Sequence, residues 1–432
     1  MEAASKRVAR AIDSRRDEIV GFLSEYVRHR SVNPRLEESG EERTCQGWLA
    51  SQLRSWSVFD RVDVWELEAG RPNVAATLKG SGDGRSLMFN GHSDTVPVEE
   101  YTAPNWTAAP FGGEVKKGRV FGRGAVDMKG GNTAFLWATR LVAEAGVELE
   151  GTVFDTLTVG EESGQHRIGV DTLPERGYRA DFLINAEATR MQICPLGVGL
   201  MCFKITVTGK GGHTSMKYRD LASPPPDEYA GVNAIEKGMK IVSALQGLEK
   251  AWIKRKRPKY MPRGASNITV SVIKGGEYVG RIPEKCEMSF LVWVSPDETV
   301  ADAIREVKGF VYDASMKDDW LRRHPPLFET PTATPDNWEP YNVPLSHPAV
   351  KTIGRAYSAA LGRRPEWSAW TAVGEVAWLK EQGIPGLIFG PGDLNNGAHG
   401  DDEHVPVREV IDCCKVYAEM ILRWCGVSGE GR

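Results

Sequence analysis

Residues 86–96 read SLMFNGHSDTV, an apolar run followed by a histidine and, two positions later, an aspartate. The run Ser86–Asn90 has the length and composition of a buried strand. Polar residues directly after such a strand lie where open α/β sheets bind ligands, beyond the carboxyl ends of the strands. A metal-binding imidazole is typically oriented by a carboxylate, so His92 and Asp94 are candidates for a metal site. The same pair also occurs as a hydrogen-bonded loop without a metal.

Short apolar runs alternate with helical patterns on both sides of this stretch. The chain is expected to open with one amphipathic helix, because apolar residues recur at helical spacing from Val8 to Val27. Further elements are expected at 73–78 (strand), 132–145 (helix), 153–159 (strand), 182–185 (strand), 349–361 (helix), 373–381 (helix) and 386–389 (strand). This alternation predicts an α/β domain with a mostly parallel sheet.

The middle of the chain has a different pattern. It predicts, in order, a strand at 199–208, a helix at 231–254, strands at 266–273 and 286–294, a helix at 299–316 and a short strand near 326–331. The order β-α-β-β-α-β is that of a ferredoxin-like α+β domain. We therefore expect residues 1–199 and 336–432 to form one domain and residues 200–335 to form an inserted second domain. The basic run 254–257 is interpreted as a solvated helix end.

Composition excludes several classes of protein. The 432 residues carry a net charge of −4, so there is no basic excess for nucleic acid or an anionic membrane. No apolar run approaches the roughly 18–20 residues that span a bilayer, and no signal-peptide pattern opens the chain. The seven cysteines are scattered without a C-x-x-C pair, which predicts buried reduced thiols. These features predict a cytoplasmic protein that binds neither nucleic acid nor a membrane.

Two further motifs present carboxylates. The glycine-rich run 122–131, GRGAVDMKGG, offers Asp127 as its carboxylate and lacks the spacing of a phosphate-binding loop. The run 160–164, GEESG, follows a predicted strand and presents Glu161 and Glu162. Adjacent carboxylates repel each other unless one binds a cation, which leaves the other free to take a proton. Such pairs are also common on protein surfaces.

Two more candidates complete a mixed set of ligands. Glu187 follows the predicted strand 182–185, and His399 stands in the C-terminal run 397–405, GAHGDDEHV. Together with the residues named above they form a set that suits two divalent cations such as zinc, manganese or cobalt. The set comprises His92, Asp127, Glu162, Glu187 and His399.

These motifs, in this order, resemble the metallopeptidase family that includes acetylornithine deacetylase, succinyl-diaminopimelate desuccinylase, aminoacylase and carboxypeptidase G. The resemblance covers nearly the whole chain and implies a zinc-peptidase-like catalytic domain with an inserted lid and dimerisation domain. It implies that His92 and Glu187 hold one metal ion, that Glu162 and His399 hold the other, and that Asp127 bridges them. Zinc is the expected metal, with manganese or cobalt as alternatives.

The resemblance also assigns catalytic roles. Glu161 would be the general base that takes a proton from a metal-bridging water, and the resulting hydroxide would attack the carbonyl. Asp94 would steer His92. His213, in the run 209–215, GKGGHTS, would reach across a homodimer and stabilise the oxyanion. Glu403 resembles a structural acid that anchors the loop after His399.

The lid departs from the family pattern. Many members carry an Arg, three residues before a proline, that binds the substrate carboxylate, whereas this chain has Trp293. The family's Asn-x-x-Pro loop begins here with Gly280. Trp293 is either core packing, with Arg281 taking over the carboxylate, or part of a pocket for a flat aromatic substrate. Asn267 is a further candidate for substrate contact.

The function expected from the resemblance is metal-dependent hydrolysis of a C–N bond in a small molecule. The favoured substrate is the amide of an N-acyl amino acid or a dipeptide-like compound. One alternative is an aminohydrolase that releases ammonia from a nitroanthranilate-type aromatic amine. Another is a non-catalytic, metal-stabilised binding protein, but the additional carboxylate of Glu161 argues against it.

Overall fold

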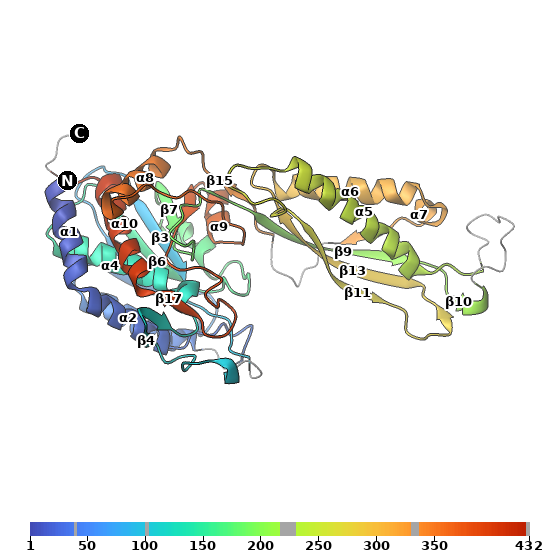
Figure 1. Cartoon of the computed structure of the whole chain (residues 1–432), viewed down its shortest axis with the longest axis horizontal. Helices are drawn as coiled ribbons and strands as arrows, with labels where there is room; N and C mark the ends of the chain where they lie inside the picture. The colour runs from blue at the N-terminus through green and yellow to red at the C-terminus, as the bar shows by residue number, and fades with distance from the viewer. Residues whose placement is uncertain (39–40, 100–102, 217–229, 330–336, 429–432) are drawn as a thin grey trace. The chain divides into compact units, whose positions relative to one another are not determined.

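The chain forms two compact units in the computed structural model (Figure 1), and each unit has its own hydrophobic core. Unit 1 holds Met1–Leu196, Tyr341–Trp370 and Gly374–Arg432, and unit 2 holds Gly197–Pro340 and Thr371–Val373. The residues described are 1–38, 41–99, 103–216, 230–329 and 337–428. The boundary expected at 335/336 lies outside the described residues, and the names catalytic domain and lid remain predictions.

A six-stranded mixed sheet forms the centre of unit 1. Its strands, in spatial order, are β1 (Arg61–Glu66), β2 (Pro72–Leu78), β6 (Val153–Thr158), β3 (Leu87–His92), β7 (Phe182–Asn185) and β16 (Gly386–Ile388). The pairs β6–β3, β3–β7 and β7–β16 are parallel, and β1–β2 and β2–β6 are antiparallel. Every residue of β3 is buried, as expected for a central strand covered on both faces.

Helices cover this sheet. They are α1 (Glu2–Ser14), α2 (Arg16–Arg28), α3 (Glu42–Ser55), α4 (Gly130–Glu144), α8 (Pro348–Leu361), α9 (Val376–Glu381) and α10 (Val407–Cys425). The helix α10 packs against α4, α8 and α1, while α3 packs on β2 and β1. The sequence pattern predicted a single opening helix, but the chain bends at Arg15 (φ −102°, ψ 13°) and forms two helices.

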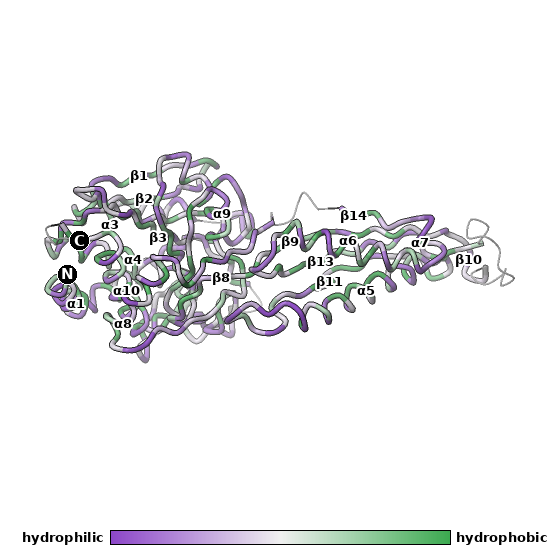
Figure 2. Tube along the Cα trace, turned by 90° about the horizontal axis from the view of Figure 1, so that it is seen from above, coloured by the Kyte–Doolittle hydropathy of each residue, from purple (hydrophilic) through white to green (hydrophobic). Residues whose placement is uncertain are grey.

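Unit 2 has the predicted ferredoxin-like fold. Its elements are β9 (Gly199–Thr208), α5 (Ala234–Arg255), β11 (Ile268–Gly275), β13 (Lys285–Val294), α6 (Val300–Met316), α7 (Asp319–Arg323) and β14 (Leu327–Glu329). The strand order is β11-β13-β9-β14, all antiparallel, and α5 and α6 pack on the sheet. Hydrophilic and hydrophobic residues alternate along α5 in Figure 2, as expected for a helix with one buried face.

The basic run at the end of α5 is exposed at Lys254, Arg255 and Arg257, as interpreted, but not at Lys256. The side chain of Lys256 is only 9% exposed. Its Nζ lies 3.3 Å from the ring centroid of Trp252 and forms ion pairs with Glu298 and Glu306. The acidic residues around α6 therefore neutralise this part of the basic run within unit 2.

Shorter strands were not predicted. The antiparallel sheet β17-β5-β4 joins His404–Pro406, Arg119–Phe121 and Glu114–Lys116, and β10 (Gly212–His213) pairs with β12 (Arg281–Ile282). Two-residue strands β8 (Leu196–Gly197) and β15 (Tyr341–Asn342) also pair. These strands are too short for sequence periodicity to reveal.

Two further expectations can be compared with the structure. All seven cysteines are free thiols, and six of them are buried, as predicted. Within the described ranges, no helix combines the length and apolar composition required to cross a membrane.

Candidate active site

The carboxyl ends of three neighbouring parallel strands carry candidate residues of unit 1. His92 ends β3, Glu161 and Glu162 follow β6, and Glu187 follows β7. Because β3 lies between β6 and β7, the loops after the three strands leave the sheet side by side. This is the sheet edge at which ligands bind in α/β folds.

Asp127 lies between the two candidate histidine ligands. Its Oδ1 is 3.1 Å from Nε2 of His92, and its Oδ2 is 3.3 Å from Nε2 of His399. An oxygen of Glu162 lies 3.0 Å from Nε2 of His399, and an oxygen of Glu187 lies 3.7 Å from Nε2 of His92. The structure thus brings all five candidates together as two groups that share Asp127.

The donor set suits divalent cations. Imidazole nitrogens and carboxylate oxygens are the ligands that zinc, manganese and cobalt bind in proteins. Ligand atoms of His92, Asp127 and Glu162 all lie within 4.8 Å of one another, close enough to share one ion. The residues present therefore fit a metal site.

Negative charge is crowded at this edge of the sheet. Burial, followed by the charge of Asp127, raises the pKa of Glu162 to about 7. Burial also raises the pKa of Glu187 well above its usual range. Hydrogen bonds with Asp127 and Glu162 raise the pKa of His399 to about 11. A divalent cation would relieve the repulsion among these carboxylates and take the place of the imidazole proton.

Glu161 lies beside the ligand groups. Its Oε2 is 3.9 Å from Nε2 of His92, and its side chain is 11% exposed. No residue within the described ranges donates a hydrogen bond to its carboxylate. Burial raises the pKa of Glu161 well above its usual range, and the charges of Glu187 and Glu162 add to this rise against the opposing effect of His92. Such a carboxyl group is suited to take up and return a proton.

Asp94 contacts His92 differently from the prediction. Nδ1 of His92 lies 2.8 Å from the backbone carbonyl of Asp94 and 3.8 Å from its carboxylate. The carboxylate instead accepts hydrogen bonds from the backbone N–H groups of Gly160 and Glu162 and from the side chain of Asn33. Asp94 therefore orients the imidazole through its main chain and the Glu161–Glu162 loop through its side chain.

Glu403 anchors the loop that carries Asp127. Its Oε1 accepts the backbone N–H groups of Val126 and Asp127 at 3.0 and 3.2 Å, and its Oε2 accepts Nη1 of Arg123 at 2.6 Å. Glu403 and Arg123 are both buried. Glu403 therefore has a structural role, as expected, and it holds the backbone of Asp127 as well as the loop after His399.

A polar layer that sequence patterns did not reveal lies beneath the ligands. Glu375 is fully buried and accepts hydrogen bonds from Asn90 of β3 and Thr158 of β6, at 2.5 and 2.9 Å. Burial raises the pKa of Glu375 to about 7. The polar Asn90 in an otherwise apolar strand was the available signal, but its partner stands 285 positions away in the sequence.

His399 has an unusual backbone. Its φ of 58° lies in the left-handed region, which residues with a Cβ rarely occupy. Such conformations cost about 1–3 kcal/mol and cluster at functional sites. The side chain remains 56% exposed, so solvent reaches this side of the site.

His213 and Arg281 are neighbours in unit 2, since β10 and β12 pair them directly. The backbone N–H of Ser215 donates to Nδ1 of His213, which leaves the proton of the neutral imidazole on Nε2. The side chain is exposed, so this N–H is available as a hydrogen-bond donor. The guanidinium of Arg281 pairs with Glu284 at 2.7 Å, and a substrate carboxylate would have to compete with that residue.

Trp293 lies outside the core of unit 2. Its neighbours Val292 and Val294 on β13 are buried in that core, whereas Trp293 is half-buried on the opposite face of the sheet. This placement argues against core packing. The amide of Asn267 donates to the carbonyls of Gly264 and Ala265 in its own loop, and its contact with substrate stays a prediction.

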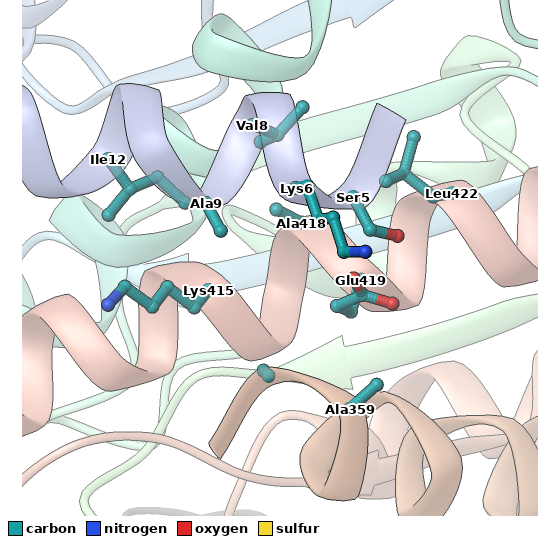
Figure 3. A pocket seen from close by; sticks show the side chains of 11 residues that line it. Ser5, Lys6, Val8, Ala9, Ile12, Ala359, Lys415, Ala418, Glu419 and Leu422 are labelled. Atoms are coloured by element: carbon teal, nitrogen blue, oxygen red, sulfur yellow. The ribbon is translucent and has the colours of Figure 1, made fainter. Parts of the chain in front are cut away.

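A separate pocket of about 110 Å³ lies between α1, α8 and α10 (Figure 3). Small and apolar side chains line most of it, with Lys6, Lys415 and Glu419 among the polar residues. It includes none of the candidate ligands. The pocket is thus a packing gap between helices and does not compete with the strand-end site.

Comparison with known proteins agrees with the fold. Residues 88–423 match the model of peptidase family M20/M25/M40. The N-formyl-4-amino-5-aminomethyl-2-methylpyrimidine deformylase of Bacillus subtilis (strain 168) is 30% identical over 427 residues, which cover 97% of each chain. Acetylornithine deacetylase of Myxococcus xanthus is 30% identical over 361 residues, covering 82% of this chain and 84% of that enzyme.

Solved structures show the same fold. A metallo-carboxypeptidase of the M20 family from Sulfolobus solfataricus superposes with a TM-score of 0.69 at 18% identity, covering 94% of this chain and 99% of that one. A dinuclear metal-binding peptidase of the same family from Bacillus subtilis superposes with a TM-score of 0.63 at 16% identity, covering 95% and 98%. Both likenesses concern the fold alone.

The fold and the family match define a hydrolase of C–N bonds in small molecules. More specifically, the chain belongs to peptidase family M20/M25/M40. The resemblance stated from the sequence motifs is thereby confirmed, as is the predicted fold class.

Proposed function

We propose that this hydrolase removes a formyl or similarly small acyl group from an amine carried by a flat heteroaromatic ring without an α-carboxylate. Trp293 is the observation that carries the proposal. It stands where many family members have a carboxylate-binding Arg, and it presents a flat apolar surface outside the core of unit 2. Gly280, in place of the family's Asn, lacks a second polar group for a carboxylate.

The relatives support this substrate class. The two deformylases, from Bacillus subtilis and Halalkalibacterium halodurans, act by name on an N-formylated aminomethylpyrimidine and match 97% and 96% of this chain. An N-acyl amino acid is the second candidate, because acetylornithine deacetylase is also 30% identical, although over less of the chain.

We infer that two divalent ions, with zinc as the first candidate, bind this site. His92 and Glu187 would hold one ion, His399 and Glu162 the other, and Asp127 would contact both. When bound, such ions polarise a carbonyl group and lower the pKa of water. Two positive ions that lie close together repel each other. The negative charge of Asp127, which lies between the two groups of ligands, would reduce this repulsion.

Glu161 supplies the proton transfer. It accepts the proton of the attacking water and returns it to the leaving nitrogen when the C–N bond breaks. The acyl group leaves as a carboxylate and the ring compound leaves as an amine. The Nε2–H of His213 would donate a hydrogen bond to the oxyanion that forms in between.

We further propose that a second copy of this chain contributes His213. Unit 2 offers an edge strand, β11, whose Val272 and Ile273 are 42% and 51% exposed. An edge strand with exposed apolar residues is suited to pairing with the same strand of another copy. A homodimer of this kind would join through unit 2.

A substrate panel tests the proposal. Chelator-stripped protein, reloaded separately with zinc, manganese or cobalt, is assayed with N-formyl-4-amino-5-aminomethyl-2-methylpyrimidine, N-acetylornithine and an anthranilate-type amine. We expect kcat/KM for the formylated pyrimidine to exceed that for N-acetylornithine by about 100-fold, and Trp293→Arg to reduce this preference. A preference for N-acetylornithine would favour the second candidate, and ammonia release from the aromatic amine would overturn deacylation.

A further inference from the structure

A buried ion pair lies behind the loop that carries Glu161. Arg71, just before β2, has a side chain that is 2% exposed, and Glu42 of α3 has one that is 1% exposed. Nε and Nη2 of Arg71 donate to the two oxygens of Glu42 at 2.7 and 2.8 Å. This two-bond geometry fixes the plane of the guanidinium.

The remaining end of that guanidinium contacts the loop. Nη1 of Arg71 donates to Oε1 of Gln165 at 2.5 Å. The amide nitrogen of Gln165 donates in turn to Oε2 of Glu68 at 2.6 Å. Because the amide of Gln165 is held at both its oxygen and its nitrogen, the orientation of the side chain is fixed.

Gln165 closes the turn that carries Glu161. Its backbone N–H donates to the carbonyl of Gly160 at 2.8 Å, and the N–H of Gly164 donates to the carbonyl of Glu161 at 2.8 Å. The other side of the turn is held by Asp94, as described above. The turn is therefore fixed at its beginning by Asp94 and at its end by Gln165.

We propose that Arg71, acting through Gln165, is a positioning residue for the general base. It holds the 160–165 turn so that the free carboxylate of Glu161 keeps its place beside the metal ligands. A buried ion pair adds little net stability, whereas its fixed geometry can orient a neighbouring group. This inference rests on the proposed role of Glu161.

Gln165→Met tests the connection without disturbing the Arg71–Glu42 pair. It replaces the amide with an apolar side chain of similar length. Arg71→Lys complements it, because lysine keeps the buried positive charge but lacks the planar fork that binds both partners. Arg43→Gln is the matched control. Arg43 lies on α3 next to Glu42, but it forms an exposed ion pair with Glu66, which does not contact the 160–165 turn.

Three quantities are measured for each metal-reloaded variant: kcat and KM on the substrate that the wild type prefers, metal content per chain, and backbone amide exchange of residues 160–165. We expect Gln165→Met and Arg71→Lys to lower kcat by about 10-fold to 100-fold with KM within about twofold and metal content unchanged. Exchange at Gly164 and Gln165 should rise about tenfold. Arg43→Gln should match the wild type in all three.

Two results would overturn the proposal. If Gln165→Met leaves both kcat and amide exchange at wild-type values, the contact does not hold the turn. Alternatively, loss of metal in parallel with kcat would mean that Gln165 supports the ligand Glu162 rather than the base. If the wild type hydrolyses none of the panel, the proposed function fails, while amide exchange still decides whether Gln165 holds the turn.

Discussion

At the scale of single residues, Glu161 lies 3.9 Å from Nε2 of His92, and no hydrogen bond to its carboxylate is formed by the described residues. We predict that Glu161→Gln lowers kcat by about 10³-fold or more, because the amide cannot accept the proton of water. Metal content should stay at the wild-type value, since Glu161 is not one of the five ligands. Element analysis together with steady-state kinetics checks both points, and wild-type turnover by this variant would exclude Glu161 as the base.

Glu403 leads to a second prediction, which concerns metal binding. Glu403→Ala removes the acceptor of the Asp127 N–H and leaves the charge of Arg123 buried without its partner. We expect metal affinity to fall about 10-fold to 100-fold and the protein to lose about 3 kcal/mol of stability. Competition with a chelating dye and denaturant unfolding measure these effects. Glu403→Gln, which keeps an acceptor, should lose less of both, and wild-type affinity in Glu403→Ala would contradict the anchoring role.

The ligand residues were predictable because His92, Glu162 and Glu187 stand at or just after apolar strands, and because Asp127 and His399 stand in polar, glycine-containing runs. Arg71, Gln165 and Glu375 were not, because their partners are distant in sequence and their own surroundings are ordinary. Asp94 illustrates a finer difference. Its proximity to His92 was predictable, but which of its oxygens faces the imidazole depends on the backbone of the turn.

At the scale of elements, Asp318 joins two helices of unit 2. It accepts hydrogen bonds from the backbone of Trp320 and Leu321 at the start of α7 and from Lys237 and Lys240 of α5. Burial raises the pKa of Asp318, but the two lysines lower it more, to about 2. Since this value lies below that of the unfolded chain, the stabilisation is complete above about pH 4 and is lost as the pH falls through about 2.

We therefore predict that Asp318→Asn destabilises unit 2 by about 1–2 kcal/mol at neutral pH. The difference in unfolding free energy between this variant and the wild type should shrink between pH 4 and pH 2. In this range Asp318 of the wild type becomes protonated and its ion pairs with the two lysines are lost. Denaturant unfolding across this pH range measures it. Asp319→Asn is the control, because Asp319 is exposed and, among the described residues, forms an ion pair with Arg322 alone. A difference that stays constant with pH would contradict the ion-pair explanation.

The order of the main strands and helices of unit 2 was predictable, because most of them are long enough to show their periods, whereas the short elements β10, β12 and α7 were not. In unit 1, the break at Arg15 was not predictable, since neither glycine nor proline marks it and the apolar spacing continues through it. The strands β5 and β17 were missed for a different reason. They have three residues each, and their pairing joins distant parts of the chain.

At the scale of the whole molecule, the proposed homodimer makes a specific prediction about mixtures. If His213 serves the site of the partner copy, Glu161→Gln and His213→Ala chains complement each other in a mixed dimer. One site of that dimer then combines an intact Glu161 with an intact His213. We expect an equal mixture of the two inactive variants, exchanged through mild denaturation, to recover about a quarter of wild-type activity from random pairing. Activity no higher than that of the separate variants would argue that His213 acts within its own chain or not at all.

The most direct test of the proposed metal-dependent hydrolysis is a titration of zinc into chelator-stripped protein, with metal binding and amide hydrolysis measured on the same samples. We predict no hydrolysis in the stripped protein and an activity that rises with zinc and saturates at about two ions per chain. Hydrolysis that persists without metal, or saturation of the protein with zinc without any gain in activity across the substrate panel, would contradict it.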